Sequence, residues 1–190
     1  MTQPPLLITG NRHKLQEFQQ VWPHLQSWDI DLPEIQHSDA RAVVRAKLLS
    51  AAQLRPGSSV MVEDTSLCLD ALGGLPGPLT KWFIQPQALG NRGLAELAIQ
   101  RQNTKAEALT LIGLLHVSTS GTETLHFFEG RIEGRVVLPR GEQGFGWDPI
   151  FQPEGSLLTF GEMNAVEKAR YSMRQQALNQ MVEAIKLLDL

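Results

Sequence analysis

The spacing of apolar residues along the chain predicts several strands. Short apolar runs that fit buried strands lie at residues 4–8, around 28–30 and at 60–62. Longer runs at 108–117 and 124–137 fit two strands of a sheet, and the polar residues 118–122 between them fit a hairpin turn. The chain is therefore expected to build a sheet that contains one long hairpin.

Helical spacing occupies the segments between these strands. Residues 14–22 place apolar groups at i, i+3 and i+7, and Pro23 ends that pattern. Asp39 is the expected N-cap of a helix over residues 40–54. Further helices are expected at 93–100, 165–171 and 174–188.

Glycine and proline are so dense at residues 71–78 that a loop is expected there. No linker, repeat or low-complexity segment divides the chain, so residues 1–190 are expected to form one domain. Because strands and helices interleave, with one long hairpin inserted, the predicted fold class is α/β with a mixed sheet.

The bulk composition narrows the class of protein. Of the 190 residues, 42% are hydrophobic and 19% are charged, with a formal net charge of -3 and a single cysteine. There is no basic cluster that could follow a nucleic-acid backbone, and no apolar stretch reaches membrane-spanning length. A single thiol forms no internal disulfide, which suits a reducing compartment. We expect a cytoplasmic protein that binds neither long nucleic acids nor membranes.

The first candidate for chemistry is the run Thr9-Gly10-Asn11-Arg12-His13-Lys14, where a predicted strand passes into a helix. Such a loop directs backbone N–H groups and the positive end of a helix at one point, which attracts phosphate. It is not a Walker loop, because the second glycine and the Lys-Ser/Thr pair are missing. A plain strand–helix turn with a solvated lysine explains the spacing equally well.

The second candidate is a set of acids at the ends of apolar strands: Asp31 and Glu34, then Glu63 and Asp64. Mg²⁺ prefers carboxylate oxygens together with water and substrate phosphates. Taken singly, each acid also fits a helix cap or a solvated turn. The adjacent pair favours a cation, because like charges at the mouth of a buried strand repel each other.

Two further segments could bind a nucleotide. The glycine-rich run Phe145-Gly146-Trp147-Asp148 could stack on a purine ring, or form a turn packed into the core. Near the C-terminus, Lys168 and Arg174 could hold a phosphate and a base carbonyl, although such a charged run usually forms a solvated helix face.

In this order, the segments closely resemble the inosine triphosphate pyrophosphatases, the Ham1 family, and its eukaryotic branch in particular. The matching stretches are ITGNRHKLQEF, DLPE, VEDTSLCLDALGGLPGPLTKWF, EGRIEGRVVLPRG, FGWDPIFQPEG and TFGEMNAVEKARYSMRQQAL, which lie between residues 8 and 178. The resemblance implies a mixed, elongated sheet flanked by helices, with two lobes, a central nucleotide-binding cleft and a homodimer. It also implies Mg²⁺-dependent hydrolysis, with Mn²⁺ as an alternative ion, of ITP, dITP and XTP to the monophosphate and pyrophosphate.

The resemblance also implies roles for individual residues. Thr9 through Lys14 and Lys47 would hold the triphosphate, and Thr65 would touch the substrate. Glu34, Glu63 and Asp64 are the expected metal ligands, with Asp64 as the base that activates water. The segment from Phe145 to Asp148 would stack on the base and sugar, and Lys168, Met173 and Arg174 would read the purine edge. On this hypothesis Arg174 donates to the 6-oxo group of hypoxanthine or xanthine.

The chain departs from the family pattern at the base-reading end. The family usually has Ser-His-Arg where this chain has Ser172-Met173-Arg174, and asparagine where it has Ala169. Methionine packs against a ring but does not donate a hydrogen bond, so the preference among purines is open to change. Two alternatives follow. One is a Maf-like pyrophosphatase for other modified nucleotides, and the other is a nucleotide-binding protein that has lost catalysis.

Overall fold

The computed structural model describes residues 5–144 and 146–187. Within them, a seven-stranded mixed sheet has the order β2-β1-β3-β5-β6-β7, with β4 paired to β3. The strands are β1 (Leu6–Ile8), β2 (Gln26–Trp28), β3 (Val60–Leu69), β4 (Pro76–Gly77), β5 (Lys105–Val117), β6 (Glu123–Val136) and β7 (Phe151–Pro153). The β1–β2 and β1–β3 pairs are parallel and the other pairs are antiparallel. The predicted α/β class with a mixed sheet is confirmed.

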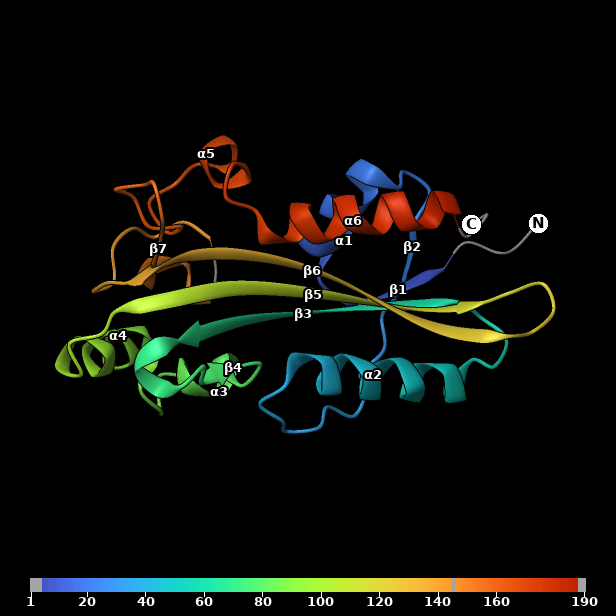
Figure 1. The fold of residues 1–190 in the computed structure, drawn as a ribbon, viewed down its shortest axis with the longest axis horizontal. Helices are drawn as coiled ribbons and strands as arrows, with labels where there is room; N and C mark the ends of the chain where they lie inside the picture. The colour runs from blue at the N-terminus through green and yellow to red at the C-terminus, as the bar shows by residue number, and fades with distance from the viewer. Residues whose placement is uncertain (1–4, 145, 188–190) are drawn as a thin grey trace.

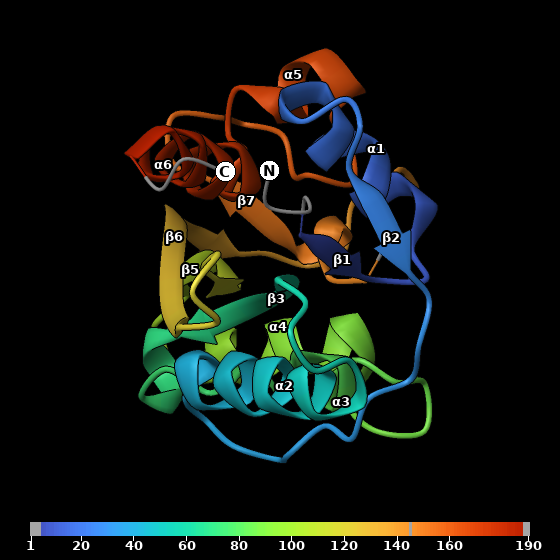
Figure 2. The ribbon, with the colours of Figure 1, turned by 90° about the vertical axis from the view of Figure 1, so that its right-hand side faces the viewer.

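Helices cover both faces of this sheet (Figures 1 and 2). One layer holds α1 and α6, with α5 beyond the start of α6, and the opposite layer holds α2, α3 and α4. The bounds are α1 (Arg12–Val21), α2 (Ala40–Leu54), α3 (Thr80–Phe83), α4 (Gly90–Gln100), α5 (Ala165–Ala169) and α6 (Met173–Leu187), with short 3₁₀ turns η1 (Asp70–Leu72) and η2 (Asp148–Ile150). No helix in the described ranges is both long and apolar enough to cross a membrane.

Most of the predicted elements are confirmed. Asp39 caps α2 as expected, because its Oδ1 accepts a hydrogen bond from the backbone N–H of Arg41 at 2.8 Å. Three predictions need correction. The third strand does not end at residue 62 but continues to Leu69, β2 ends at Trp28, and the expected loop at 71–78 contains the two-residue strand β4.

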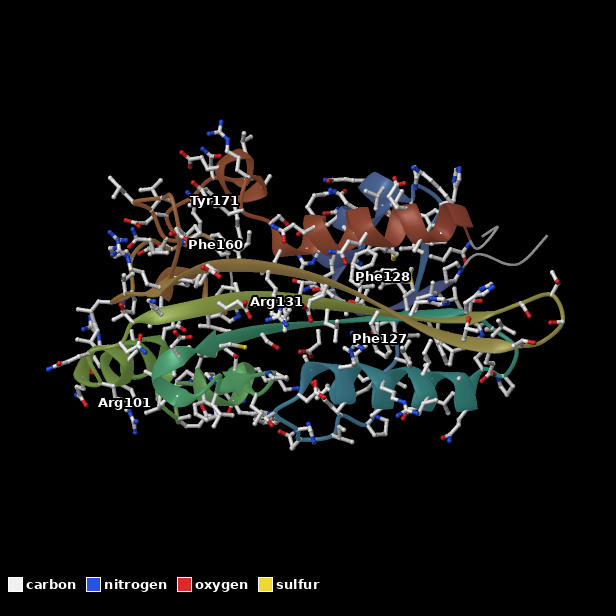
Figure 3. All side chains as sticks on the ribbon, in the orientation of Figure 1. Arg101, Phe127, Phe128, Arg131, Phe160 and Tyr171 are labelled. Atoms are coloured by element: carbon white, nitrogen blue, oxygen red, sulfur yellow. The ribbon has the colours of Figure 1, made fainter. Side chains whose placement is uncertain are left out.

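The alternation of side chains along β3 divides the core into two layers. Met61 packs with α1 and α6, whereas Val60 and Val62 pack beneath α2. Figure 3 shows the same alternation on β6, where Phe128 lies on the α6 side and Phe127 on the α2 side. Since successive side chains of a strand point to opposite faces, Glu63 and Asp64 must do so as well.

One edge of β3 is only partly covered by neighbouring strands. β1 pairs with Val60 and Met61, and β4 pairs with Leu67 and Cys68. Between these two contacts, residues 62–66 have a strand partner, β5, on one side only. This open segment carries both acids of the Glu63-Asp64 pair, so it lies where a ligand can approach the sheet.

Helix α6 is fixed along the edge of β6. The side-chain amide of Gln180 accepts from the N–H of Glu129 and donates to its carbonyl, and Gln176 accepts from the N–H of Arg131. Gly130 lies between these contacts, and a Cβ at this position would stand 1.8 Å from the carbonyl oxygen of Met173. The absence of a side chain there allows the first turn of α6 to lie directly on the sheet.

Candidate active site

A cavity of about 620 Å³ opens beside the uncovered edge of β3. Both helix layers contribute to its wall: α1 and α6 with α5 from one side, α2 and α3 from the other. Its charged lining residues are Lys14, Glu17, Glu34, Lys47, Glu63, Asp64, Lys81, Asp148, Lys168 and Arg174. The cavity therefore brings together most of the predicted functional residues from segments that are far apart in sequence.

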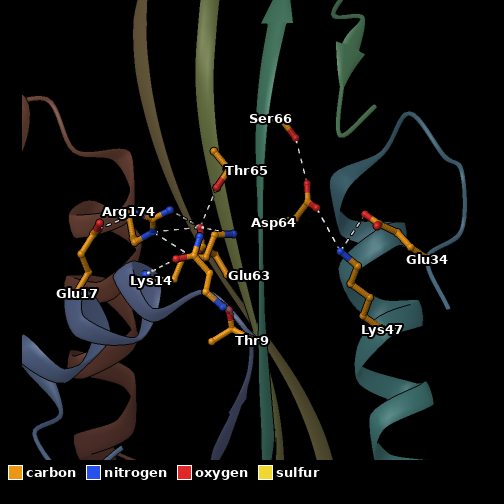
Figure 4. Close-up of polar contacts among 11 residues, drawn as sticks. Thr9, Lys14, Glu17, Glu34, Lys47, Glu63, Asp64, Thr65, Ser66 and Arg174 are labelled. Atoms are coloured by element: carbon orange, nitrogen blue, oxygen red, sulfur yellow. Dashed lines mark hydrogen bonds and ion pairs between the residues drawn. The ribbon is translucent and has the colours of Figure 1, made fainter. Parts of the chain in front are cut away.

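Two acids and two lysines meet on the α2 side of β3, and Figure 4 shows Glu34, Asp64 and Lys47 among them. The Nζ atom of Lys47 lies 3.0 Å from Oε1 of Glu34 and 3.5 Å from Oδ1 of Asp64. The ammonium of Lys81 donates to Oε2 of Glu34. Ser66 donates to the other oxygen of Asp64 at 3.4 Å. Lys47 thus bridges two carboxylates, one from the segment before α2 and one from β3.

The environment moves the pKa values of these two acids in opposite directions. Burial raises the pKa of Asp64, and nearby Glu34 and Glu63 raise it further, against the lowering effect of Lys47 and Lys14. For Glu34, burial also raises the pKa, but hydrogen bonds from Lys81 and Lys47 outweigh it and the net pKa is lowered. Asp64 is therefore a buried carboxylate whose negative charge its surroundings only partly compensate.

Glu63 lies on the other face of β3, and its side chain is 2% exposed. Its carboxylate accepts hydrogen bonds from Arg174 at 3.0 to 3.2 Å and from Thr65 at 2.8 Å, and Lys14 lies 3.7 Å away. Burial raises the pKa of Glu63, but Lys14 and Arg174 outweigh it and lower the pKa to about 2. Both carboxylate oxygens of Glu63 therefore already have partners within the protein, of which Arg174 and Lys14 are cationic.

The structure does not bring the three predicted metal ligands into one cluster. In the ranges 5–144 and 146–187, no group of three or more His, Cys, Asp or Glu side chains could hold a metal ion. Glu34 and Asp64 share Lys47 on one face of the sheet, while Glu63 pairs with Arg174 on the other face. The physical reason is the alternation of the strand, which continues past both acids instead of ending before them.

Of the predicted phosphate-binding run, Lys14 alone of the described side chains lines the cavity. Thr9 and Asn11 shape the turn into α1, because the N–H of Asn11 donates to Thr9 Oγ1 and the N–H of Lys14 donates to Asn11 Oδ1. Gly10 and Arg12 are exposed, and the side chain of His13 lies outside the described residues. The run thus delivers one lysine to the cavity through the start of α1.

The opposite end of the cavity is aromatic. Trp147 and Phe160 both line it, with ring centroids 6.1 Å apart. Gly146 is held from α4 by Asn91, whose Nδ2 donates to the Gly146 carbonyl at 2.7 Å. Phe145, which was predicted to stack on a base, lies outside the described residues.

Lys168 is the cation at this aromatic end. Its Nζ lies 2.6 Å from Oδ2 of Asp148 and 5.1 Å from the ring centroid of Phe160. Met173 lines the same region and is buried in the neighbouring core. Asp148 and Lys168 thus form an ion pair beside the aromatic part of the cavity wall.

Arg174 does not present its guanidinium to the cavity in the way the sequence hypothesis assumed. Its Nε and Nη2 atoms donate to Glu63, and its Nη1 donates to Glu17 at 2.7 Å. Burial lowers the pKa of Arg174, but the two carboxylates outweigh it and raise the pKa. In this structure Arg174 ties α6 to β3 and α1.

Sequence reasoning did not assign a role to Lys81 or Phe160. Both lie within stretches that resemble the Ham1 family, but neither is part of a recognisable chemical pattern. Lys81 follows the loop that is rich in glycine and proline, and only the folded chain brings it to Glu34. The one signal in the sequence for Lys81 was its positive charge next to a loop at a predicted cleft.

Comparisons with known proteins agree with this geometry. Residues 6–184 match the model of the Ham1 family. The inosine triphosphate pyrophosphatase 1 of Trypanosoma cruzi is 41% identical over 90% of this chain and 87% of its own length. The inosine triphosphate pyrophosphatase of Schizosaccharomyces pombe is 39% identical over 97% and 93%. A solved HAM1 protein from Coxiella burnetii, 25% identical, covers 95% of this chain and 97% of its own, with a TM-score of 0.80.

These similarities confirm the predicted resemblance, including that to eukaryotic relatives, and the predicted hydrolase class. The family match spans both helix layers and every segment that lines the cavity. The chain belongs to the Ham1 family.

Proposed function

We propose that this protein hydrolyses inosine triphosphate to the monophosphate and pyrophosphate. The observation that carries the proposal is a single cavity whose wall holds both a cluster of lysines and acids around Asp64 and the aromatic side chains Trp147 and Phe160. A purine nucleoside triphosphate has the same division, because its polyphosphate is anionic and its base is a flat ring. The names of the two relatives support ITP as the substrate.

The cationic end suits a triphosphate. Lys14, Lys47 and Lys81 line it from three different helices. Their ammonium groups are compact donors on flexible stems, so they can follow the phosphate oxygens. Neutralising the polyphosphate makes the pyrophosphate a better leaving group.

Glu34 and Asp64 fit a magnesium ion. Mg²⁺ is commonly held by one or two carboxylates, with substrate phosphates and water completing its shell. The raised pKa of Asp64, which burial and neighbouring acids cause, indicates a pair of acids that favours a further cation. When bound, the ion would neutralise charge on the triphosphate and on the departing pyrophosphate. We do not include Glu63, because its side chain lies on the other face of β3 from Glu34 and Asp64, where Arg174 holds it.

Asp64 is the proposed general base. It is 8% exposed and lies at the uncovered edge of β3, with Lys47 on one oxygen and Ser66 on the other. From there its carboxylate would orient a water molecule and accept its proton as the oxygen attacks phosphorus. The reaction requires an ionised Asp64, and Lys47 lowers the pKa of this carboxyl against the effect of burial.

The base end favours a 6-oxopurine. The ring of Trp147 can lie against a purine, and Lys168 is a donor that would pair with the 6-oxo group. Adenine carries an amino donor at that position, so two donors would face each other. We assign this role to Lys168 instead of Arg174 because of its place beside the aromatic wall: its ammonium lies next to Phe160 and would share its donors between Asp148 and the 6-oxo group, whereas the Arg174 guanidinium is held beside β3 by Glu63 and Glu17.

The same argument extends the proposed substrates to dITP and XTP, since both carry the 6-oxo group.

A cytoplasmic homodimer remains a prediction from composition and resemblance, and analytical ultracentrifugation tests its assembly state. The Maf-like alternative makes a different prediction, since that enzyme would prefer a modified pyrimidine or methylated nucleotide in a substrate panel.

The proposed reaction is tested by identifying its products. Purified protein, ITP and MgCl₂ are incubated, and nucleotides, pyrophosphate and phosphate are separated by anion exchange. We expect IMP and pyrophosphate in equal amounts, with no IDP. Formation of IDP and phosphate would show a different bond being broken, and binding of ITP without turnover would favour a protein that has lost catalysis.

A further inference from the structure

Lys47 and Lys81 occupy the position that a divalent cation would need. Lys47 Nζ lies between the two proposed ligands, 3.0 Å from Glu34 and 3.5 Å from Asp64. Lys81 binds the second oxygen of Glu34. Two ammonium groups thus balance two carboxylates, and both oxygens of Glu34 already have a cationic partner (Figure 4 shows the Lys47 bridge).

A divalent ion that reached these acids alone would lie within contact distance of both lysines. Repulsion between like charges at 3 to 4 Å is strong in a partly buried site, where water screens it poorly. The ion would also lose hydration that Mg²⁺ gives up reluctantly. The two acids are therefore poorly suited to bind a divalent ion in the absence of another anion.

A triphosphate supplies that anion. Its oxygens offer Lys47 and Lys81 new acceptors, and the lysines that turn toward them leave the oxygens of Glu34 and Asp64 for the ion. Lys81 can move most easily, because its side chain is 51% exposed, against 17% for Lys47. The exchange keeps every carboxylate neutralised before and after binding.

We infer that Lys47 and Lys81 hold the place of the cation between Glu34 and Asp64, so that the ion and the triphosphate bind together. The inference rests on the proposed function, because it takes these acids as the metal ligands. By linkage, the triphosphate must strengthen ion binding by the same factor as the ion strengthens triphosphate binding. Removing a lysine should weaken that coupling by making the free protein a better ion binder.

The test measures binding of Mn²⁺ to the protein without nucleotide, by electron paramagnetic resonance of the unbound ion. The variants are Lys81→Met and Lys47→Met, with Lys186→Met as the control, since Lys186 pairs with Glu183 on the surface. We expect the wild-type protein and the control to bind Mn²⁺ weakly and alike. Lys81→Met should bind it at least about 10-fold more tightly, as expected when a like charge is removed at contact distance.

Two additional measurements make the outcome specific. Adding Asp64→Asn to Lys81→Met should abolish the gained Mn²⁺ affinity, which places the ion at these acids. Adding the non-hydrolysable α,β-imido analogue of ITP to the wild-type protein should produce a ternary complex that water-proton relaxation distinguishes from the Mn²⁺–analogue complex.

The inference is overturned if wild-type protein binds Mn²⁺ alone as tightly as Lys81→Met does, or if neither lysine variant gains affinity. Lys81→Met keeps the test usable if Lys47→Met does not fold, because Lys81 is half exposed. Failure of the proposed function would look different: the wild-type protein would release no pyrophosphate from ITP, whatever its Mn²⁺ affinity.

Discussion

Burial of the Asp64 carboxylate makes an unfavourable contribution to the stability of the fold. Burial raises the pKa of Asp64, so the ionised form that the proposed chemistry needs is less favoured in the fold than in water. Such a conflict between local stability and charge is common at functional sites. It gives Asp64 a signature that separates it from the structural acids nearby.

The substitution Asp64→Asn should lower kcat for ITP by at least ~100-fold, since losing a general base typically costs that much. The melting temperature without metal should stay the same or rise, because the amide removes a charge whose burial is unfavourable. Steady-state pyrophosphate release and thermal denaturation in EDTA check the two halves. Near-normal turnover would remove Asp64 from the role of base.

Glu63 should behave as a structural acid. In contrast to Asp64, its ionised form should stabilise the folded protein. Its folded pKa of about 2 lies below the ordinary 4.5, so its ionised form stabilises the fold above pH 4.5. That stability, on the order of 3 kcal/mol for a shift of this size, is lost as the pH falls from 4.5 toward 2.

The variant Glu63→Gln lacks this contribution at every pH. In urea denaturation with EDTA, it should be less stable than wild type at pH 6, and the difference should shrink as the pH approaches 2. A difference in unfolding free energy that stays constant over this range would mean that the ion pair with Arg174 does not lower the Glu63 pKa.

Lys168 and Lys81 are lysines that line one cavity beside different partners, Phe160 for Lys168 and Glu34 for Lys81, which makes them matched variants. Lys168→Met should lower the ratio of kcat/KM for ITP over ATP by about 10-fold, the typical effect of losing a charged hydrogen-bond donor. Lys81→Met should lower kcat/KM for both nucleotides and leave their ratio unchanged. If both variants change the ratio equally, Lys168 does not read the base.

At the scale of elements, the position of α6 depends on how closely the helix approaches β6. The edge of β6 at residues 129 and 131 makes hydrogen bonds to glutamines of α6 instead of to another strand. This arrangement covers a sheet edge that would otherwise be open to other chains. It also fixes the first turn of α6, which carries Met173 and Arg174 into the cavity wall.

Two substitutions test this contact. Gly130→Ala should destabilise the protein by about 3 kcal/mol or more, because the new methyl group overlaps the Met173 carbonyl. Gln180→Leu should cost about 1 to 2 kcal/mol by leaving two backbone groups of Glu129 without their partner. Gly93→Ala in α4 is the control, since its Cβ meets only the side chain of Leu89 and helical alanine is favourable. Equal unfolding free energies for all three variants would contradict the packing account.

Elements with strong local signals could be predicted from the sequence. The periodicity of α2, its Asp39 cap and the long hairpin of β5 and β6 are properties of short segments. The end of β3 could not be predicted in this way. Four consecutive polar residues, 63–66, conceal the strand, which persists because β5 pairs with every residue from Val60 to Leu69. Strands β4 and β7 are also too short to form without a partner.

At the scale of the molecule, the residue types of the site could be predicted, but their partners could not. The acids, Lys14, Lys47 and the aromatic segment were identified from sequence and resemblance. Which acid pairs with which cation depends on the face of β3 to which the acid points and on contacts made by α2, α3 and α6. Sequence spacing does not encode such contacts, and for that reason Glu63 was grouped with the metal ligands and Lys81 was missed.

The division of the cavity into a cationic end and an aromatic end leads to a single claim about selectivity. The cationic end should accept the polyphosphate of any nucleotide, whereas Lys168 beside Phe160 should favour a base with a 6-oxo acceptor. Both ends must act on one molecule for pyrophosphate to be released efficiently.

The most direct test is the ratio of kcat/KM for ITP and ATP, measured as pyrophosphate release with saturating Mg²⁺. We expect a ratio of at least ~100, because the ammonium of Lys168 would face an acceptor in one substrate and a donor in the other. Equal kcat/KM values for the two nucleotides would contradict it.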